Sequence, residues 1–397
     1  MATLIHRSTG ENTAQFGFRG TDLGYFVQTN HGYVLSLFGD TFDNPMPGGP
    51  GWRSPVILRT HNTDLAQGVR WDNAVGGARA KQAIDYVHEH PDTAYRLQDR
   101  ATTQIPNDAV HLPDGRYLMS TFLVRSWERH GDASWLTWCN RLHVSHQRDA
   151  EVWEPTRWQD VTGGPVQFNN EGEWSKFQNC TFTLWADGYL YMFGTQSGRY
   201  DNGGIYLARV RWENWDRLAA WEFWGWTGES WAWGTPHATP IIMPTVPGTA
   251  IGEISSQVLD GQVVLSYMDY GIGAVTRTAV RPDSVWTDPQ VHTTDGRFPR
   301  LYAPSLHPYS TLERPYLHLS QWTSDFYGSN FLALDAIQSA EPVAPDTPSG
   351  DGSVEGTDLG TCRDLSSLTA EELAQVLTQD TTVTAEELLE AMTRPAE

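Results

Sequence analysis

The stretch Asn30-His31-Gly32-Tyr33-Val34-Leu35-Ser36-Leu37-Phe38 places a tight polar turn directly before a run of strand-forming residues. The same order, a turn followed by an apolar strand, recurs four more times along the chain. The later copies are Pro113-Asp114-Gly115 into 117–120, Ala186-Asp187-Gly188 into 189–193, Leu259-Asp260-Gly261 into 263–267, and Glu313-Arg314-Pro315 into 316–320. Asp-Gly between apolar runs is a strong short-range signal for a β-hairpin. The sequence therefore predicts five copies of one hairpin-based unit.

A further strand is expected after each of these turn-strand segments. These expected strands are 56–59, 136–142, 204–210, 274–279 and 330–334. Three to four strands per unit, repeated five times, predict an all-β, five-bladed β-propeller. The turns lie further apart than in a usual propeller repeat, so long loops must be inserted. A β-sandwich with long loops is the structural alternative.

Two carboxylates flank the first hairpin, in Gly20-Thr21-Asp22-Leu23-Gly24 and in Leu37-Phe38-Gly39-Asp40-Thr41-Phe42. If Val27 pairs with Tyr33, Asp22 lies opposite Phe38 and diagonal to Asp40, roughly 7–8 Å away on the same face. A one-residue slip would separate them. Asp beside Gly at a strand end also commonly caps a turn, so the local pattern leaves a structural role open.

The segments Thr21-Asp22-Leu23-Gly24 and Phe38-Gly39-Asp40-Thr41-Phe42 resemble the opening signature of the family first described as domain of unknown function 4185. That family is associated with glycoside hydrolase family 183, endo-D-arabinanases that act on the arabinan of mycobacterial and corynebacterial envelopes. The resemblance extends to about residue 338 and implies a five-bladed propeller with Asp22 and Asp40 as catalytic residues.

Glycosidic cleavage needs one protonated carboxylic acid and one carboxylate that acts as base or nucleophile. The sequence does not decide which Asp is the acid. It also leaves retention or inversion open, although the resemblance favours inversion.

The composition limits the class of ligand. The chain has 397 residues, 18 of them Trp, and a formal net charge of −21. Nucleic-acid grooves and anionic membrane surfaces require clustered Lys and Arg, so neither is an expected partner. Trp and Tyr also line sugar sites, where their rings stack and their polar edges form hydrogen bonds. We therefore expect a neutral or cationic substrate, with a polysaccharide, arabinan, as the partner that the resemblance implies.

In a propeller the inner strand of each blade faces a central funnel, so functional side chains are expected at matching places in several blades. Asp22, Asn107, Asp108, Gln178, Asn179, Glu253 and Tyr302 are the polar residues found there. The loop containing Trp52 and Arg53 is expected to form one wall of the cleft. We predict a substrate-binding set of Trp52, Arg53, Asp108, Asn179, Glu253 and Tyr302. The alternative is that these polar residues tie neighbouring blades together and that Trp52 packs on its own blade.

Other motifs point to structure rather than chemistry. The Trp-rich segments 221–226 and 231–233 fit a glycan-stacking platform or a hydrophobic seal between blades, and the seal is favoured. Cys139, Cys180 and Cys362 show no metal-ligand spacing and are interpreted as buried thiols. His88-Glu89-His90 is interpreted as a solvated loop. We expect no cofactor and no catalytic metal, although the acidic loop from Asp40 to Asp43 leaves a structural Ca²⁺ open.

The composition changes after residue 338. We predict a propeller over 1–338, a flexible linker rich in Pro, Gly and Ser over 339–365, and a helical tail over 366–397. Thr369 with Glu372 and Thr384 with Glu387 form capping boxes that begin two short helices. The tail is expected to dock on a virion component or a sister subunit, and a disordered end is the alternative.

The setting is interpreted from what the sequence lacks and from the resemblance. No secretory h-region follows Met1, and no run of 18 apolar residues occurs. Members of the resembled family occur in phages of actinobacteria, which suggests a virion tail enzyme acting at the bacterial envelope. The competing function is a glycan-binding, receptor-recognising propeller without turnover.

Overall fold

The computed structural model of the chain describes residues 2–88 and 100–341. Within these ranges the regular structure consists of β-strands and five short 3₁₀ helices. The 3₁₀ helices are η1 (Gly10–Phe16), η2 (Leu65–Gln67), η3 (Gly172–Phe177), η4 (Trp212–Asn214) and η5 (Leu218–Ala220). Most of the predicted linker and the whole predicted helical tail lie outside the described residues.

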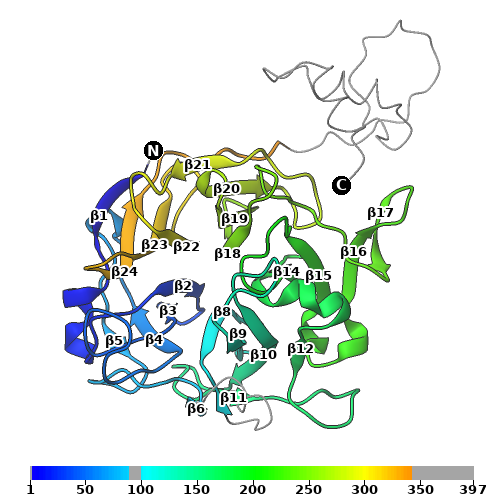
Figure 1. The fold of residues 1–397 in the computed structure, drawn as a ribbon. Helices are drawn as coiled ribbons and strands as arrows, with labels where there is room; N and C mark the ends of the chain where they lie inside the picture. Colours follow the sequence, from blue (N-terminus) through cyan, green and yellow to red (C-terminus); the bar gives the residue numbers. More distant parts are fainter. Residues whose placement is uncertain (1, 89–99, 342–397) are drawn as a thin grey trace, which may run out of the picture. The chain divides into compact units, whose positions relative to one another are not determined.

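Five antiparallel sheets form the body of the fold, and Figure 1 shows them arranged around a common centre. Blade 1 contains β2 (Leu23–Gln28), β3 (Val34–Phe38), β4 (Val56–Thr60) and β5 (Asn73–Ala74). Blade 2 contains β8 (Gln104–His111), β9 (Tyr117–Ser126), β10 (Leu136–Ser145), β11 (Glu154–Pro155) and β12 (Gln167–Asn169). Blade 3 contains β13 (Asn179–Leu184), β14 (Tyr189–Thr195), β15 (Tyr206–Arg211), β16 (Glu222–Trp226) and β17 (Trp231–Thr235).

Blades 4 and 5 continue the same order. Blade 4 contains β18 (Ile251–Leu259), β19 (Gln262–Asp269), β20 (Gly273–Ala279) and β21 (Gln290–Thr293). Blade 5 contains β22 (Leu301–Leu306), β23 (Tyr316–Trp322), β24 (Tyr327–Ala333) and β1 (Thr3–Arg7). A small parallel pair, β6 (Val87–His88) with β7 (Arg100–Ala101), lies in the long insertion between blades 1 and 2.

The ring is closed by strands from the two ends of the propeller. β1 pairs antiparallel with β24 and so completes the last blade with the first strand of the chain. The inner strands β2, β8, β13, β18 and β22 contact one another in a closed circuit. The prediction of a five-bladed all-β propeller is confirmed, and the sandwich alternative is wrong because the sheets do not stack as two layers.

The hydrophobic core lies between adjacent blades. One cluster joins Leu118 and Leu142 of blade 2 to Phe182 and Met192 of blade 3. Another joins Phe26 and Phe38 of blade 1 to Phe331 of blade 5. Because each sheet buries both faces against its neighbours, its strands are apolar on both sides, which explains the continuous apolar runs in the sequence. Cys139 and Cys180 are buried free thiols, as predicted.

The register of the first hairpin differs from the prediction. Val27 pairs with Leu35 rather than Tyr33, and the connection is closed by the Thr29 hydroxyl, which donates to the Tyr33 carbonyl at 2.6 Å. A β-bulge follows at Leu23 and Gly24, whose φ angles are 61° and 101°. A bulge leaves one residue unpaired and turns the strand. As a result the Asp22 carbonyl accepts the Gly39 amide at 3.1 Å, so Asp22 lies opposite Gly39 and not opposite Phe38.

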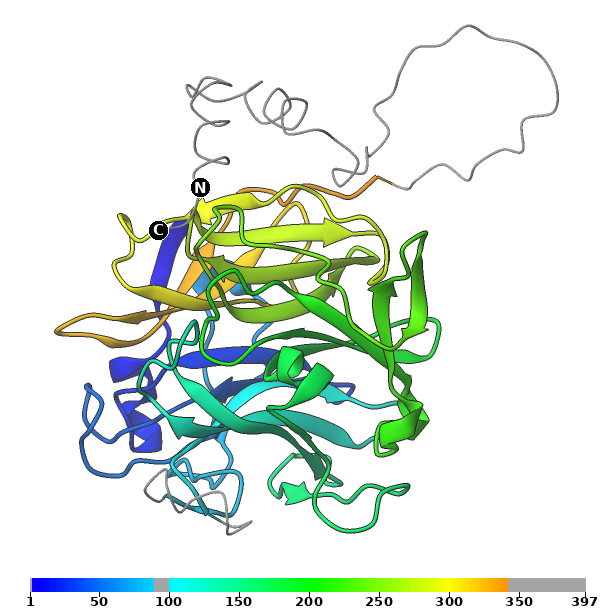
Figure 2. The same ribbon diagram turned by 45° about the vertical axis from the view of Figure 1, so that its right-hand side comes forward.

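The Trp-rich segment forms the outer hairpin of blade 3, β16–β17, which projects from the rim of the ring in Figures 1 and 2. Trp221 is buried, and the Trp233 indole donates to Asp283 beyond blade 4 strand β20 at 3.0 Å. This part seals blade 3 against blade 4. Trp226 and Trp231 at the tip are exposed. Among the described helices, none is long and apolar enough to cross a membrane.

Removal of residues 1–8 should open the ring, because it deletes β1 and the buried Ser8, whose hydroxyl donates to the Ser329 carbonyl at 2.9 Å. Each lost hydrogen bond contributes on the order of 1 kcal/mol, so we expect a loss of at least about 3 kcal/mol in unfolding free energy. The measurement is denaturant unfolding. Leu4→Ala, at an exposed position of the same strand, is the matched control and should change stability by less than about 0.5 kcal/mol. Equal stability of the truncated and parent chains would contradict the closure.

Candidate active site

The inner strands contact one another around the centre of the ring. We call the end of the ring where these strands begin the mouth. The Tyr302 hydroxyl, at the start of β22, donates to Asp22 Oδ2 at 2.9 Å. The Asn179 amide, at the start of β13, donates to the Gly252 carbonyl at the start of β18 over 3.5 Å. These contacts cross from blade 5 to blade 1 and from blade 3 to blade 4. Residues far apart in the sequence are therefore brought together at the mouth.

Asp22 lies directly before β2, where the bulge turns its side chain into the mouth. Its Oδ2 accepts the Tyr302 hydroxyl, whereas its Oδ1 is buried without a hydrogen-bond partner among the described residues. A Cβ on Gly39 would approach Asp22 Oδ1 to 2.4 Å. Glycine at position 39 is thus what leaves room for the Asp22 carboxyl group.

Asp40 follows β3 and is held by donors from two other segments. The Trp52 indole and the Thr103 hydroxyl both donate to Asp40 Oδ1, each at 2.7 Å. The Tyr327 hydroxyl donates to the Asp40 backbone carbonyl at 3.1 Å. Hydrogen bonds that point at a carboxylate favour its ionised form. Asp40 is therefore fixed in orientation and prepared to carry a negative charge.

The two carboxyl groups are in unlike electrostatic environments. Burial, reinforced by the Asp40 carboxylate, raises the pKa of Asp22 to about 7, against the opposing effect of the Tyr302 and Tyr327 hydroxyls. Burial raises the pKa of Asp40 as well, and the hydrogen bonds from Thr103 and Trp52 and the nearby His88 only partly oppose that rise. Neighbouring carboxyl groups in unlike surroundings are typical of acid and base partners.

Four of the predicted substrate-binding residues lie at the mouth. Tyr302 contacts Asp22, and Glu253 forms a buried ion pair with Arg199 at 2.5 Å. Asn179 and Glu253 each keep one buried oxygen, Oδ1 and Oε2, without a partner among the described residues. Trp52 is also at the mouth. Its ring lies 4.1 Å from His88 and nearly parallel to Phe42, so its clearest role is to orient Asp40.

Two predicted binding residues are placed away from the Asp22–Asp40 pair. Arg53 is buried, pairs with Asp43 at 2.8 Å and donates to the Gly17 carbonyl, and so it holds the loop together. Asp108 accepts the Thr181 hydroxyl at 2.6 Å and the Phe182 amide at 2.8 Å. Both contacts tie blade 2 to blade 3. Burial raises the pKa of Asp108 to about 7.

Asn107 and Gln178 also serve the framework. The Asn107 amide donates to Ser120 and to the Gln178 carbonyl, and the Gln178 amide donates to the carbonyls of Phe168 and Trp174. This agrees with the alternative that such residues tie blades together. Polar groups in a buried sheet need partners, and neighbouring blades supply them.

Sequence reasoning missed several residues of the mouth, namely Thr103, Arg199, Tyr270 and Tyr327, and misjudged His88. His88 is half-buried, and its ring nitrogens contact Gln82 Oε1 at 2.9 Å and the Thr102 carbonyl at 3.0 Å. Glu89 and His90 lie outside the described residues. Arg199 and Tyr270 stand on loops rather than inner strands, so the search along inner strands could not find them.

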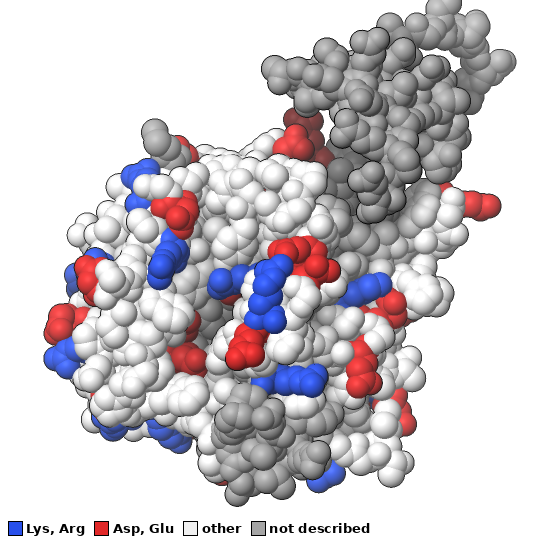
Figure 3. Space-filling view, viewed as in Figure 1, with Lys and Arg blue, Asp and Glu red and all other residues white. Residues whose placement is uncertain are grey.

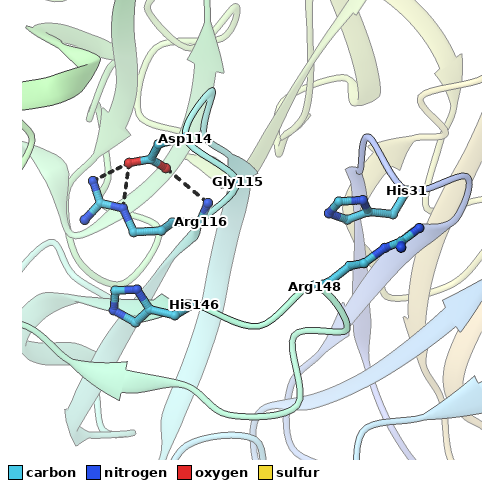
Figure 4. Close-up of a pocket in the computed structure, with 6 residues that line it drawn as sticks. All are labelled: His31, Asp114, Gly115, Arg116, His146 and Arg148. Atoms are coloured by element: carbon cyan, nitrogen blue, oxygen red, sulfur yellow. Dashed lines mark hydrogen bonds and ion pairs between the residues drawn. The ribbon is translucent and has the colours of Figure 1, made fainter.

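The opposite end of the propeller carries a separate open cavity of about 540 Å³. Figure 4 shows the Asp114–Arg116 ion pair on one side of it and His31 with Arg148 on the other. His31 lies in the β2–β3 turn, at the far end of blade 1 from Asp22. Figure 3 shows acidic and basic side chains interspersed over the viewed face. Neither feature competes with the mouth as the place for two-carboxylate chemistry.

Asp22→Asn should make the protein relatively more stable at alkaline pH. The raised pKa means that folded Asp22 binds its proton more tightly than the unfolded chain, so its contribution is present at low pH and is lost as pH rises toward 7. We expect the unfolding free energy of the variant, relative to that of the parent, to rise by about 1–4 kcal/mol between pH 5 and pH 8. Denaturant unfolding at both pH values measures this. The exposed Asp288→Asn is the control, and a gain of the same size there, or none in Asp22→Asn, would refute the burial argument.

Several known proteins are similar in sequence to this chain over most of its length. A protein named notoamide biosynthesis cluster protein J' from Aspergillus versicolor is 28% identical over 329 residues, covering 79% of this chain and 84% of that protein. An uncharacterized 35.9 kDa protein from Mycolicibacterium smegmatis is 25% identical, covering 80% of this chain and 91% of its own.

A solved structure from Bacteroides ovatus shares the fold with a TM-score of 0.54 at 14% identity, covering 81% of this chain and 87% of that one. The sequence matches the family described as domain of unknown function 4185 over residues 7–332, from β1 to β24. The chain belongs to the DUF4185 family.

Proposed function

We propose that this protein is a glycoside hydrolase that cleaves D-arabinan of the actinobacterial cell envelope, with Asp22 as general acid and Asp40 as base or nucleophile. The observation that carries the proposal is the unlike setting of two carboxyl groups at one mouth. Asp22 is buried beside Asp40 and has a pKa of about 7, so it keeps its proton near neutral pH. Asp40 receives two hydrogen bonds on one oxygen.

In this mechanism Asp22 protonates the leaving glycosidic oxygen. The Tyr302 hydroxyl donates to Oδ2 and so fixes the orientation of the carboxyl group. Proton transfer from a positioned acid contributes about 10²–10⁴-fold to the rate. Tyr302 orients the carboxyl group without removing its proton, because the pKa of Tyr302 is itself raised by burial and by Asp22.

Asp40 supplies the negative charge. Trp52 and Thr103 occupy its Oδ1, so Oδ2 is the oxygen that would activate water or attack the anomeric carbon. An oxocarbenium-like transition state carries positive charge, which an ionised carboxylate at this place stabilises. In this mechanism Oδ1 of Asp40 holds the side chain in place, and Oδ2 takes part in the reaction.

The choice of substrate rests on family membership and on the resemblance of the opening motifs to endo-D-arabinanases. It is supported by a relative from a mycobacterium and by the mixed charges in Figure 3, which suit a neutral polysaccharide. On the resemblance alone, we propose a phage tail as the setting, from which such an enzyme would reach the envelope from outside. The competing proposal, a glycan-binding propeller without turnover, does not require carboxyl groups of unequal pKa.

Asp22→Asn and Asp40→Asn should each lower the release of oligosaccharides from mycobacterial arabinogalactan by at least about 10²-fold, because each removes one of two required carboxyl groups. The measurement is chromatography of soluble products. Asp288→Asn, remote in the sequence and exposed, should release products like the parent. Polysaccharide binding by the parent without any release would favour the glycan-binding alternative.

The value of kcat/KM should fall as the pH rises, with a midpoint near 7, because Asp22 must carry its proton to act as the acid. An acid limb should appear as Asp40 becomes protonated. Initial rates on a soluble arabinan between pH 4 and 9 measure both limbs. A rate that stays constant from pH 6 to 9 would be incompatible with Asp22 as the acid.

A further inference from the structure

Arg199 reaches across three blades at the mouth. It stands on the loop between β14 and β15 of blade 3, and its guanidinium donates through Nε and Nη2 to Glu253 Oε1 of blade 4 at 3.0 and 2.5 Å. The same group lies 5.2 Å from the ring centre of Tyr270 and 5.4 Å from that of Tyr302. Tyr302 in turn donates to Asp22. One side chain therefore contacts both a predicted binding residue and the partner of the proposed acid.

The loop that carries Arg199 is fixed in an unusual backbone conformation. Gly198 and Arg199 both have positive φ, 74° and 51°. A Cβ on Gly198 would meet the Trp135 carbonyl of blade 2 at 1.9 Å. A non-glycine residue in this region costs on the order of 1 kcal/mol, and such strain concentrates at functional sites. The fold thus maintains the position of Arg199 at an energetic cost.

Buried acceptor oxygens without partners lie at the same mouth. Glu253 Oε2 and Asn179 Oδ1 belong to side chains that are 7% and 5% exposed, and neither oxygen has a partner among the described residues. A buried acceptor without a donor costs about 1–3 kcal/mol. Adjacent hydroxyl groups of a sugar are donors that could satisfy two such oxygens at once. Arg199 occupies only Oε1, so Glu253 Oε2 is left without a donor among the described residues.

We propose that Arg199, Glu253 and Asn179 form a clamp for one sugar unit, in which Glu253 Oε2 and Asn179 Oδ1 accept hydrogen bonds from neighbouring hydroxyls and Arg199 is the positioning residue. The clamp rests on the proposed function, because it acts at the same mouth. Arg199 orients the Glu253 carboxyl group through two hydrogen bonds to Oε1. The nearby Glu253 raises the pKa of Arg199 in spite of burial. By packing on Tyr302 it also links the bound sugar to the orientation of Asp22.

Substitution of Arg199 or Glu253 distinguishes the clamp from a purely structural ion pair. A structural pair would affect folding alone, whereas the clamp determines affinity for the sugar. Lys at position 199 keeps the charge but cannot reproduce the forked donation or the stacking on Tyr270 and Tyr302. A charge-assisted hydrogen bond contributes about 1.5–3 kcal/mol, which corresponds to a factor of roughly 10–100 in affinity.

The test measures binding and turnover separately. Titration calorimetry measures the affinity for a linear arabino-oligosaccharide in the Asp40→Asn background, where turnover is blocked. The proteins compared are Asp40→Asn alone and Asp40→Asn combined with Arg199→Lys, Arg199→Met, Glu253→Gln or Arg129→Met. Arg129 pairs with Asp201 on the same loop and is exposed, so Arg129→Met is the control for loop disturbance. In the otherwise unsubstituted protein the same changes are assayed for kcat and KM, and thermal unfolding verifies folding.

We expect Arg199→Lys and Glu253→Gln to weaken binding and raise KM by about tenfold or more, Arg199→Met to weaken both further, and Arg129→Met to match the parent. If Arg199→Met does not fold, the Lys and Gln variants decide. The clamp would be overturned if the folded variants bound the oligosaccharide with an affinity within twofold of the Asp40→Asn protein. It would also be overturned if the Asp40→Asn protein itself did not bind. Cleavage by the parent with unaffected variants would reject the clamp alone, whereas clamp-dependent binding without cleavage would reject the proposed hydrolase alone.

Discussion

The hydrogen bond from Tyr302 to Asp22 joins the last blade to the first at the point where the chain closes its ring. In this blade the first strand of the chain, β1, pairs with β24 at the outer edge, and the inner strand β22 contacts β2 of blade 1. Closure therefore does more than remove an exposed sheet edge. It creates a corner in which one half-buried carboxyl group is held near a second one.

The surroundings of the two Asp residues in that corner are the reason why we propose different roles for them. Burial outweighs the opposing effect of the Tyr302 and Tyr327 hydroxyls on Asp22, so its neutral form is favoured. Asp40 sits against an indole and a hydroxyl that both favour the charged form. Such arrangements cost stability, which the large inter-blade core offsets. The bulge at Leu23 and Gly24 and the missing side chain at Gly39 are the local features that let the two groups share one mouth.

The architecture could be predicted from the sequence because each blade repeats an Asp-Gly or similar turn before an apolar strand, and five repeats imply a ring. The motif around Asp22 and Asp40 also pointed to the pair that we propose as catalytic. The register could not be predicted, since it depends on a bulge stabilised by contacts from blade 5, where His318 packs against Gly24. Arg199 and Tyr327 were missed because their function arises from contacts between blades, which local patterns do not encode. Arg53 and Asp108 show the converse, because polar residues at suggestive positions had framework partners.

The most direct test of this account is the titration of the Asp22 carboxyl group, followed by ¹³C NMR of side-chain carboxyls in protein labelled at aspartate and assigned by comparison with Asp22→Asn. The account predicts a midpoint near 7 for Asp22, the value that burial and Asp40 impose on it. It further predicts that this midpoint falls when Asp40 is replaced by Asn, since one negative charge is then removed. A midpoint near 4, unchanged by that replacement, would mean that both carboxyls are ionised at neutral pH and would contradict the acid–base assignment.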